Sequence, residues 1–146
     1  MTGVGTLREG PLHRSLKEWY RRDGDQLEVD VEGYIVDVVR DNQLIEIQTG
    51  SFSKIGPKLD ALLGTHGVRV VHPVTLSRHI LRVDQDGVLL SRRRSPKKGG
   101  YNDVFAELTA WPRLLADPSF AVELVAVHVD EVRVRDGRRA WRRHGW

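Results

Sequence analysis

The chain has 146 residues, enough for one domain of ordinary size with a hydrophobic core, and a modest formal net charge of +3. Hydrophobic residues make up 40% and charged residues 29%, which is typical of a folded, soluble protein. The absence of cysteine excludes disulfides and thiolate zinc sites and suits the cytoplasm, and no apolar run approaches the ~20 residues of a membrane-spanning helix. We expect a cytoplasmic protein without a membrane partner.

The N-terminal part of the chain predicts a helix followed by three short strands. Apolar residues recur at helical spacing over residues 11–22, namely at Leu12, Leu16, Trp19 and Tyr20. Two dipeptides that favour tight turns, Glu32-Gly33 and Asp41-Asn42, then separate three strand-like stretches. The predicted strands are QLEVDV at 26–31, YIVDVV at 34–39 and QLIEIQ at 43–48.

A second helix is predicted from Ser53 to Leu63, where Gly64 ends it. The nearly continuous apolar run VRVVHPV at 68–74 is typical of a strand buried on both faces. A strand, a helix and a buried strand in this order imply a right-handed crossover and a parallel pair. Beyond them we expect a hairpin turning at Asp86-Gly87, a helix over 102–108, a long strand over 119–129 and another hairpin over 132–141.

These elements predict an α/β (α+β) fold in one domain over residues 1–146. Its core would span about residues 7–76: a helix, a three-stranded antiparallel meander, a helix and a parallel strand. A C-terminal β/α extension would cover about 77–135. A basic tail, about 136–146, would follow, either as a native end or as the point at which a longer protein is cut.

The two short turns fix which residues of the meander face each other. Counting back from them places Asp37 opposite Glu46 and Glu28 opposite Asp37, so that three carboxylates share one row. The other face of the meander is apolar and is expected to be core: Leu27, Val29, Val31, Tyr34, Val36, Val38, Ile45 and Ile47.

Like charges opposite each other on a sheet cost a few tenths to ~1 kcal/mol per pair, and burial increases the cost. A divalent cation between Asp37 and Glu46 would remove the conflict, and Mg²⁺ favours one or two carboxylates plus waters. The alternative is a solvent-exposed face, on which alternating polar residues are ordinary. Three apolar residues on the same face argue against that alternative: Ile35, Val39 and Leu44.

Basic residues are segregated into two segments. SRRRSPKK at 91–98 contains five basic residues and no acid, and residues 133–146 contain six arginines against one aspartate. Such segregation suits a polyanion such as nucleic acid, whereas a solvated, solubilising face is the plainer interpretation. The candidate phosphate contacts are Arg92, Arg93, Arg94, Lys97, Lys98, Arg138, Arg139, Arg142 and Arg143.

The meander and its acids resemble the PD-(D/E)XK nuclease superfamily. The predicted core over 11–74 has the order of elements of that restriction-endonuclease-like fold. Asp37 matches the acid of the second strand, and Glu46-Ile47-Gln48 occupies the acid-x-Lys motif of the third. LIEIQTGSF also resembles the form of this motif found in the Holliday-junction-resolvase and RecB-like branches.

The resemblance implies a Mg²⁺- or Mn²⁺-dependent nuclease acting on DNA, with Asp37 and Glu46 as metal ligands. Glu9 or Glu28 would be an accessory acid. This chain departs from the family at Gln48, where the motif usually has lysine. Gln48 could position water, and Lys58 on the following helix is the candidate replacement lysine.

Other interpretations stay open at the level of sequence. A catalytically inactive module on the same fold would bind nucleic acid or protein without cleavage. RNA is an alternative ligand, and a homodimer is compatible with the sequence. No histidine has the spacing of a zinc protease motif, and His72 is expected to be a satisfied strand residue. Trp141, between two arginine pairs, favours an interaction surface.

Overall fold

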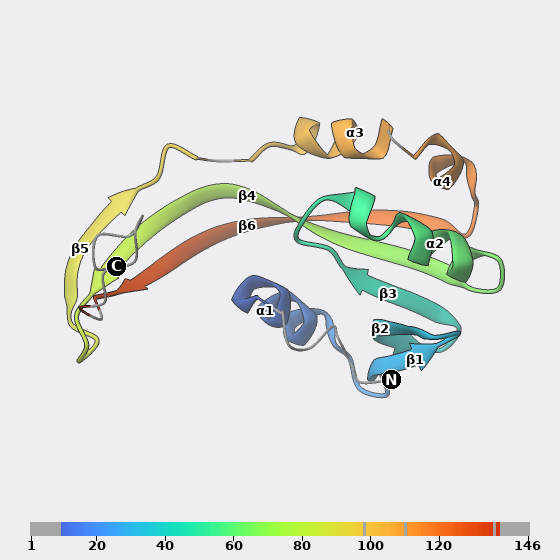
Figure 1. The fold of residues 1–146 in the computed structure, drawn as a ribbon, viewed down its shortest axis with the longest axis horizontal. Coiled ribbons are helices and arrows are strands. Elements are labelled where there is room, and N and C mark those ends of the chain that lie inside the picture. Colours follow the sequence, from blue (N-terminus) through green and yellow to red (C-terminus); the bar gives the residue numbers. More distant parts are fainter. Residues whose placement is uncertain (1–9, 98, 110, 136, 138–146) are drawn as a thin grey trace. The chain divides into compact units, whose positions relative to one another are not determined.

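The computed structural model describes residues 10–97, 99–109, 111–135 and 137. It shows a mixed α+β protein with a six-stranded sheet and, in this part of the chain, four α-helices (Figure 1). Contacts divide the chain into two compact units, Met1–Pro73 with Tyr101–Val125 and Val74–Gly100 with Ala126–Trp146. The first break lies close to the expected end of the core at about residue 76, but residues 101–125 return to the first unit.

The first unit begins with α1 (Pro11–Tyr20) and the meander β1 (Gln26–Val31), β2 (Tyr34–Arg40) and β3 (Gln43–Ile47). The meander is antiparallel, and both turns have the expected two residues, since Val31 pairs with Tyr34 and Arg40 with Gln43. Positive φ angles at Glu32 (53°), Gly33 (86°) and Asp41 (51°) give these turns the backbone that two-residue hairpins require.

The crossover that follows β3 has the expected order of elements. A 3-10 helix, η2 (Phe52–Lys54), precedes α2 (Gly56–Leu63), and β4 (Gly67–Val83) then pairs with β3 in parallel. The helix predicted from Ser53 therefore starts as a 3-10 turn, because Pro57 can enter an α-helix only in its first turn. Three segments complete this unit: α3 (Tyr101–Thr109), α4 (Pro112–Ala116) and the first part of β6 (Phe120–Val134).

The core of the first unit lies on the predicted apolar face of the meander. Four of its residues are at most 2% exposed: Val36, Val38, Ile45 and Ile47. The other four, on β1 and at the start of β2, are only partly buried. Leu44 and Val70 are also buried, so the centre of the sheet is covered on both faces. Trp19, expected in the apolar stripe of α1, is instead 70% exposed.

The second unit contains the remainder of β4, the remainder of β6, and β5 (Leu89–Arg94). The predicted hairpin is present: β4 and β5 are antiparallel around Gly87, whose φ is 82°. β4 is longer than expected, because residues 67–83 form one strand where the sequence suggested two. β6 likewise runs to Val134, so residues 132–134 continue the strand that the sequence predicted over 119–129. Residues 138–141 of the hairpin expected over 132–141 lie outside the described part.

None of the helices in the described part of the chain is long and apolar enough to cross a membrane.

Candidate active site

Asp37 and Glu46 lie across from each other on β2 and β3, as the turn lengths predicted. Val38 pairs with Ile45 and Val39 with Leu44, and the two acids are the next residues along this register. The backbone N–H of Asp37 donates to Oε1 of Glu46 at 3.4 Å, and that of Ile47 donates to Oδ2 of Asp37 at 2.8 Å. Glu46 is only 5% exposed, so at this position the solvent-exposed alternative is wrong.

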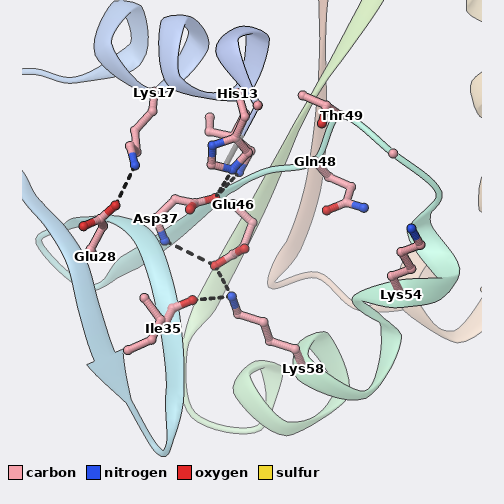
Figure 2. Close-up of a pocket in the computed structure, with 13 residues that line it drawn as sticks. His13, Lys17, Glu28, Ile35, Asp37, Glu46, Gln48, Thr49, Lys54 and Lys58 are labelled. Atoms are coloured by element: carbon pink, nitrogen blue, oxygen red, sulfur yellow. Dashed lines mark hydrogen bonds and ion pairs between the residues drawn. The ribbon is translucent and has the colours of Figure 1, made fainter. Parts of the chain in front are cut away.

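Each of the two carboxylates has one cationic or basic neighbour from a helix (Figure 2). Lys58 of α2 places Nζ 2.7 Å from Oε1 of Glu46 and also donates to the carbonyl of Ile35. His13 of α1 places Nε2 3.2 Å from Oδ2 of Asp37. Among the described residues, Oδ1 of Asp37 and Oε2 of Glu46 take no hydrogen bond. One oxygen of each carboxylate therefore remains available to a ligand.

Burial raises the pKa of Glu46 from 4.5 to about 7. Desolvation of the carboxylate is the largest cause, the nearby charge of Asp37 adds to it, and the ammonium of Lys58 opposes both. The pair therefore has a negative charge that the single lysine does not fully balance. A carboxyl in this state gains from any further cation that comes within a few ångströms.

Glu28 continues the acidic row, but it is engaged differently. Its Oε1 accepts a hydrogen bond from Lys17 of α1 at 2.9 Å, and its side chain is 38% exposed. Its φ of 53° lies in the left-handed region, which costs a non-glycine residue roughly 1–2 kcal/mol. Leu27 and Val29 on either side keep their partners on β2, so the distortion is confined to Glu28.

These groups line one pocket of about 330 Å³ in the first unit (Figure 2). Five of the residues predicted for the site line this pocket: Glu28, Asp37, Glu46, Gln48 and Lys58. It missed three basic residues that also line the pocket, His13, Lys17 and Lys54. His13 and Lys17 are four residues apart on α1, so the sequence indicated that they share one face of the helix. It did not indicate which part of the sheet that face would contact.

Gln48 is fixed by the backbone around it. The side-chain Nε2 of Gln48 donates to the main-chain carbonyl of Ser51 at 2.8 Å. The main-chain carbonyl oxygen of Gln48 lies 2.6 Å from Nδ1 of His72. The ring of His72 also meets Phe52 edge-on, with centroids 5.0 Å apart. His72 is thus a satisfied strand residue, as expected. Gln48 lines the pocket, and its side chain makes no hydrogen bond to either carboxylate.

The candidate phosphate contacts that the structure describes do not line this pocket. Arg92, Arg93 and Arg94 are exposed on β5 of the second unit, and Lys97 is exposed in the segment that follows. Six of the predicted site residues, like Trp141, lie outside the described residues: Glu9, Lys98, Arg138, Arg139, Arg142 and Arg143.

The donor set for a metal consists of two carboxylates. Within the described ranges, no group of three or more His, Cys, Asp or Glu side chains is placed to hold an ion. Asp37 and Glu46 nevertheless suit Mg²⁺, which keeps several waters and needs only one or two protein carboxylates. The raised pKa of Glu46 and the unengaged oxygens of the pair support this fit.

Residues 10–146 match the family described as "Domain of unknown function (DUF8091)", and the chain belongs to that family. It is also similar to a protein of Treponema pallidum (strain Nichols), whose printed name is "Uncharacterized protein". The two are 34% identical over 134 residues, which cover 91% of this chain and 53% of the relative. The chain thus spans about half the length of the curated relative that it matches. No solved structure matches the chain.

Proposed function

We propose that this chain is a metal-dependent nuclease domain with a PD-(D/E)XK, restriction-endonuclease-like core that hydrolyses phosphodiester bonds in DNA. The observation that carries the proposal is Glu46, 5% exposed and adjacent to a second carboxylate and a lysine inside an open pocket. Burying two adjacent carboxylates costs free energy, and a bound metal ion would compensate for that cost.

Asp37 and Glu46 are the residues that would hold Mg²⁺ or Mn²⁺, with Glu28, and Glu9 outside the described part, as accessory acids. When bound, such an ion polarises a phosphoryl oxygen and lowers the pKa of water.

The chain's own residues would do the rest. Lys58 supplies the positive charge that the family places at the position of Gln48, and an ammonium in a partly buried site can stabilise charge developing on phosphate oxygens. The Nζ of Lys58 lies 2.7 Å from Glu46, the acid of the motif that contains Gln48, which supports this role. Gln48 would orient a water through its side-chain oxygen, since its Nε2 is engaged with Ser51.

Nucleic acid would be held by arginines that have no acidic partner. In the described part of the chain, Arg92, Arg93 and Arg94 form no ion pair, although other cations of β4 and β6 do. Phosphate contacts of this kind give affinity that falls steeply with salt and carries little sequence preference. Lys97 belongs to the same basic surface, and the remaining arginines and lysine of the prediction would extend it.

One observation favours a second candidate, a module on the same fold that binds nucleic acid or protein without cleaving DNA. The position that usually carries the catalytic lysine holds a neutral amide that donates to a backbone carbonyl. In this case the carboxylate pair would be retained without turnover.

A plasmid-cleavage assay with Mg²⁺ or Mn²⁺ distinguishes the two functions. The nuclease proposal expects cleavage that falls on the order of 100-fold or more in Asp37→Asn and in Glu46→Gln. Asp60→Asn is the matched control, because Asp60 is an exposed acid on α2 that does not line the pocket. Salt-sensitive DNA binding with no cleavage at any metal concentration would favour the second candidate.

A further inference from the structure

The segment Thr49–Lys54 forms a rim of the pocket that the proposed chemistry does not use. Thr49, Gly50 and Lys54 line the pocket. Figure 2 shows Thr49 and Lys54 on the side that also carries Gln48. In the part of the chain that the structure describes, neither backbone N–H of Thr49 and Gly50 makes a hydrogen bond. The rim therefore contains an exposed lysine and two backbone N–H groups that donate no hydrogen bond to the described residues.

Lys54 differs from the other basic side chains of the pocket because none of the described acids lies beside it. Lys17 contacts Glu28, Lys58 contacts Glu46 and His13 contacts Asp37, all within 3.2 Å. No described acid lies within ion-pair distance of Lys54. Its charge is thus available to an anion, and lysine binds phosphate as a point charge.

A carboxylate that does not line the pocket anchors this rim. Glu107 of α3 accepts hydrogen bonds at Oε2 from the hydroxyl of Ser51 and from the backbone N–H of Phe52, both at 3.1 Å. Phe52 is 3% exposed and packs against His72. The backbone that carries Lys54 is therefore held from two sides, so its position relative to the carboxylates is set before any ligand arrives.

We infer that Thr49–Lys54 is a second phosphate-binding subsite, with Lys54 as its cation and Glu107 as the residue that positions it. The phosphate bound there belongs to the same DNA strand but is not the one at Asp37 and Glu46. This inference rests on the proposed function for the identity of the ligand. Cleavage itself is not required, because the subsite binds phosphate through its own donors.

The salt dependence of DNA binding tests the subsite directly. A short DNA duplex is titrated with the full chain carrying Glu46→Gln, without metal, at several salt concentrations. Each phosphate contact contributes about 0.9 to the slope of log affinity against log salt, so adding Lys54→Ala should reduce that slope by roughly 1. Lys54→Arg should retain it. Arg113→Ala, which removes an exposed cation of the same unit outside the pocket, should leave the slope unchanged.

The positioning role of Glu107 is tested with a double-mutant cycle between Glu107 and Lys54. Glu107→Ala should weaken DNA binding in the parent protein but add little once Lys54 is already alanine, because both changes remove the same contact. Glu107→Gln keeps an acceptor oxygen for Ser51 and Phe52 and should restore binding. Thermal unfolding of each variant identifies any loss that comes from misfolding, which Lys54→Arg and Glu107→Gln are chosen to avoid.

The outcomes separate this inference from the nuclease proposal. An unchanged salt slope in Lys54→Ala, or wild-type binding that does not depend on salt, overturns the subsite. A reduced slope together with no cleavage by the wild-type chain supports the subsite and overturns the nuclease proposal. Equal and additive effects of Glu107→Ala in both backgrounds overturn the positioning role alone.

Discussion

The carboxylate pocket of the first unit and the arginine-bearing strand of the second treat charge in opposite ways. In the pocket, Glu46 and Lys58 are largely removed from water and held against each other at 2.7 Å. On β5, Arg92, Arg93 and Arg94 are exposed and, among described residues, unpaired. Removing the charge of Lys58 should therefore destabilise the fold, whereas removing one of the arginines on β5 should alter only ligand binding.

The largest effect on stability is expected from Lys58→Met. This change leaves Glu46 buried without its cation, and breaking a buried ion pair costs about 3 kcal/mol. We expect a loss of that size in the free energy of unfolding measured with urea at pH 8, and recovery of part of it in Lys58→Met with Glu46→Leu. Lys54→Met is the control, since that exposed lysine should change stability by less than about 0.5 kcal/mol. Equal losses in the two single variants would show that the contact with Glu46 is not the reason why Lys58 stabilises the fold.

The pH dependence of stability should reveal the raised pKa of Glu46. The folded carboxyl keeps a proton that the unfolded chain releases near pH 4.5, so stability falls as the pH rises from there through about 7. The whole change is about 3 kcal/mol, since a tenfold difference in proton affinity is worth about 1.4 kcal/mol, and about 2 kcal/mol of it falls between pH 5.5 and 8. This dependence of the free energy of unfolding on pH should disappear in Glu46→Gln. Identical pH profiles of the two proteins would contradict the assignment.

The lowered pKa of Asp25 predicts a pH dependence of stability that is opposite in sign to that of Glu46. Arg40 donates to both oxygens of Asp25, at 2.9 and 2.7 Å, and lowers the pKa of this carboxyl from 3.8 to about 2. Its contribution is present above pH 4 and is lost as the pH falls through 3.8 toward 2. Asp25→Asn should cost about 1–2 kcal/mol at pH 7 and shift the onset of acid unfolding, followed by circular dichroism. The nearby exposed Asp23→Asn provides the comparison.

The smallest change in stability is expected on β5. Arg93→Ala should alter the free energy of unfolding by less than about 0.5 kcal/mol, because the side chain is exposed and has no acidic partner in the described chain. The same variant should reduce the slope of DNA affinity against salt by roughly 1. A marked loss of stability without any change in binding would show that β5 supports the fold instead of a ligand.

The meander was predictable because its determinants are local. Glu32-Gly33 and Asp41-Asn42 favour the positive φ angles that the structure has, and a two-residue turn leaves one register. The row formed by Asp37 and Glu46 follows from that register alone. The apolar face was predicted on the same basis, although β1 at the edge of the sheet is less buried than its pattern suggests.

The remainder of the site depends on contacts between segments far apart in the chain. Nothing in the neighbourhood of Lys17 indicates that its side chain will be about 90% buried against a strand eleven residues away. Glu107 reaches Ser51 across 56 positions of sequence. Trp19 shows the converse, since its spacing fits the apolar stripe of α1 while the packed sheet leaves it exposed. Periodicity identifies the faces of a helix but not the width of the surface that covers them.

The three arginines of β5 also have a consequence for the sheet itself. β5 ends the order of the described strands, so no other described strand pairs with its outer edge, which could pair with a strand of another molecule. Positive side chains on such an edge repel an identical edge, which is one way in which natural sheets avoid growing into fibrils. The arginines that suit a polyanion would thus also oppose self-assembly of the protein. Neutralising their charge, by a bound ligand or by substitution, would make aggregation through this edge more favourable.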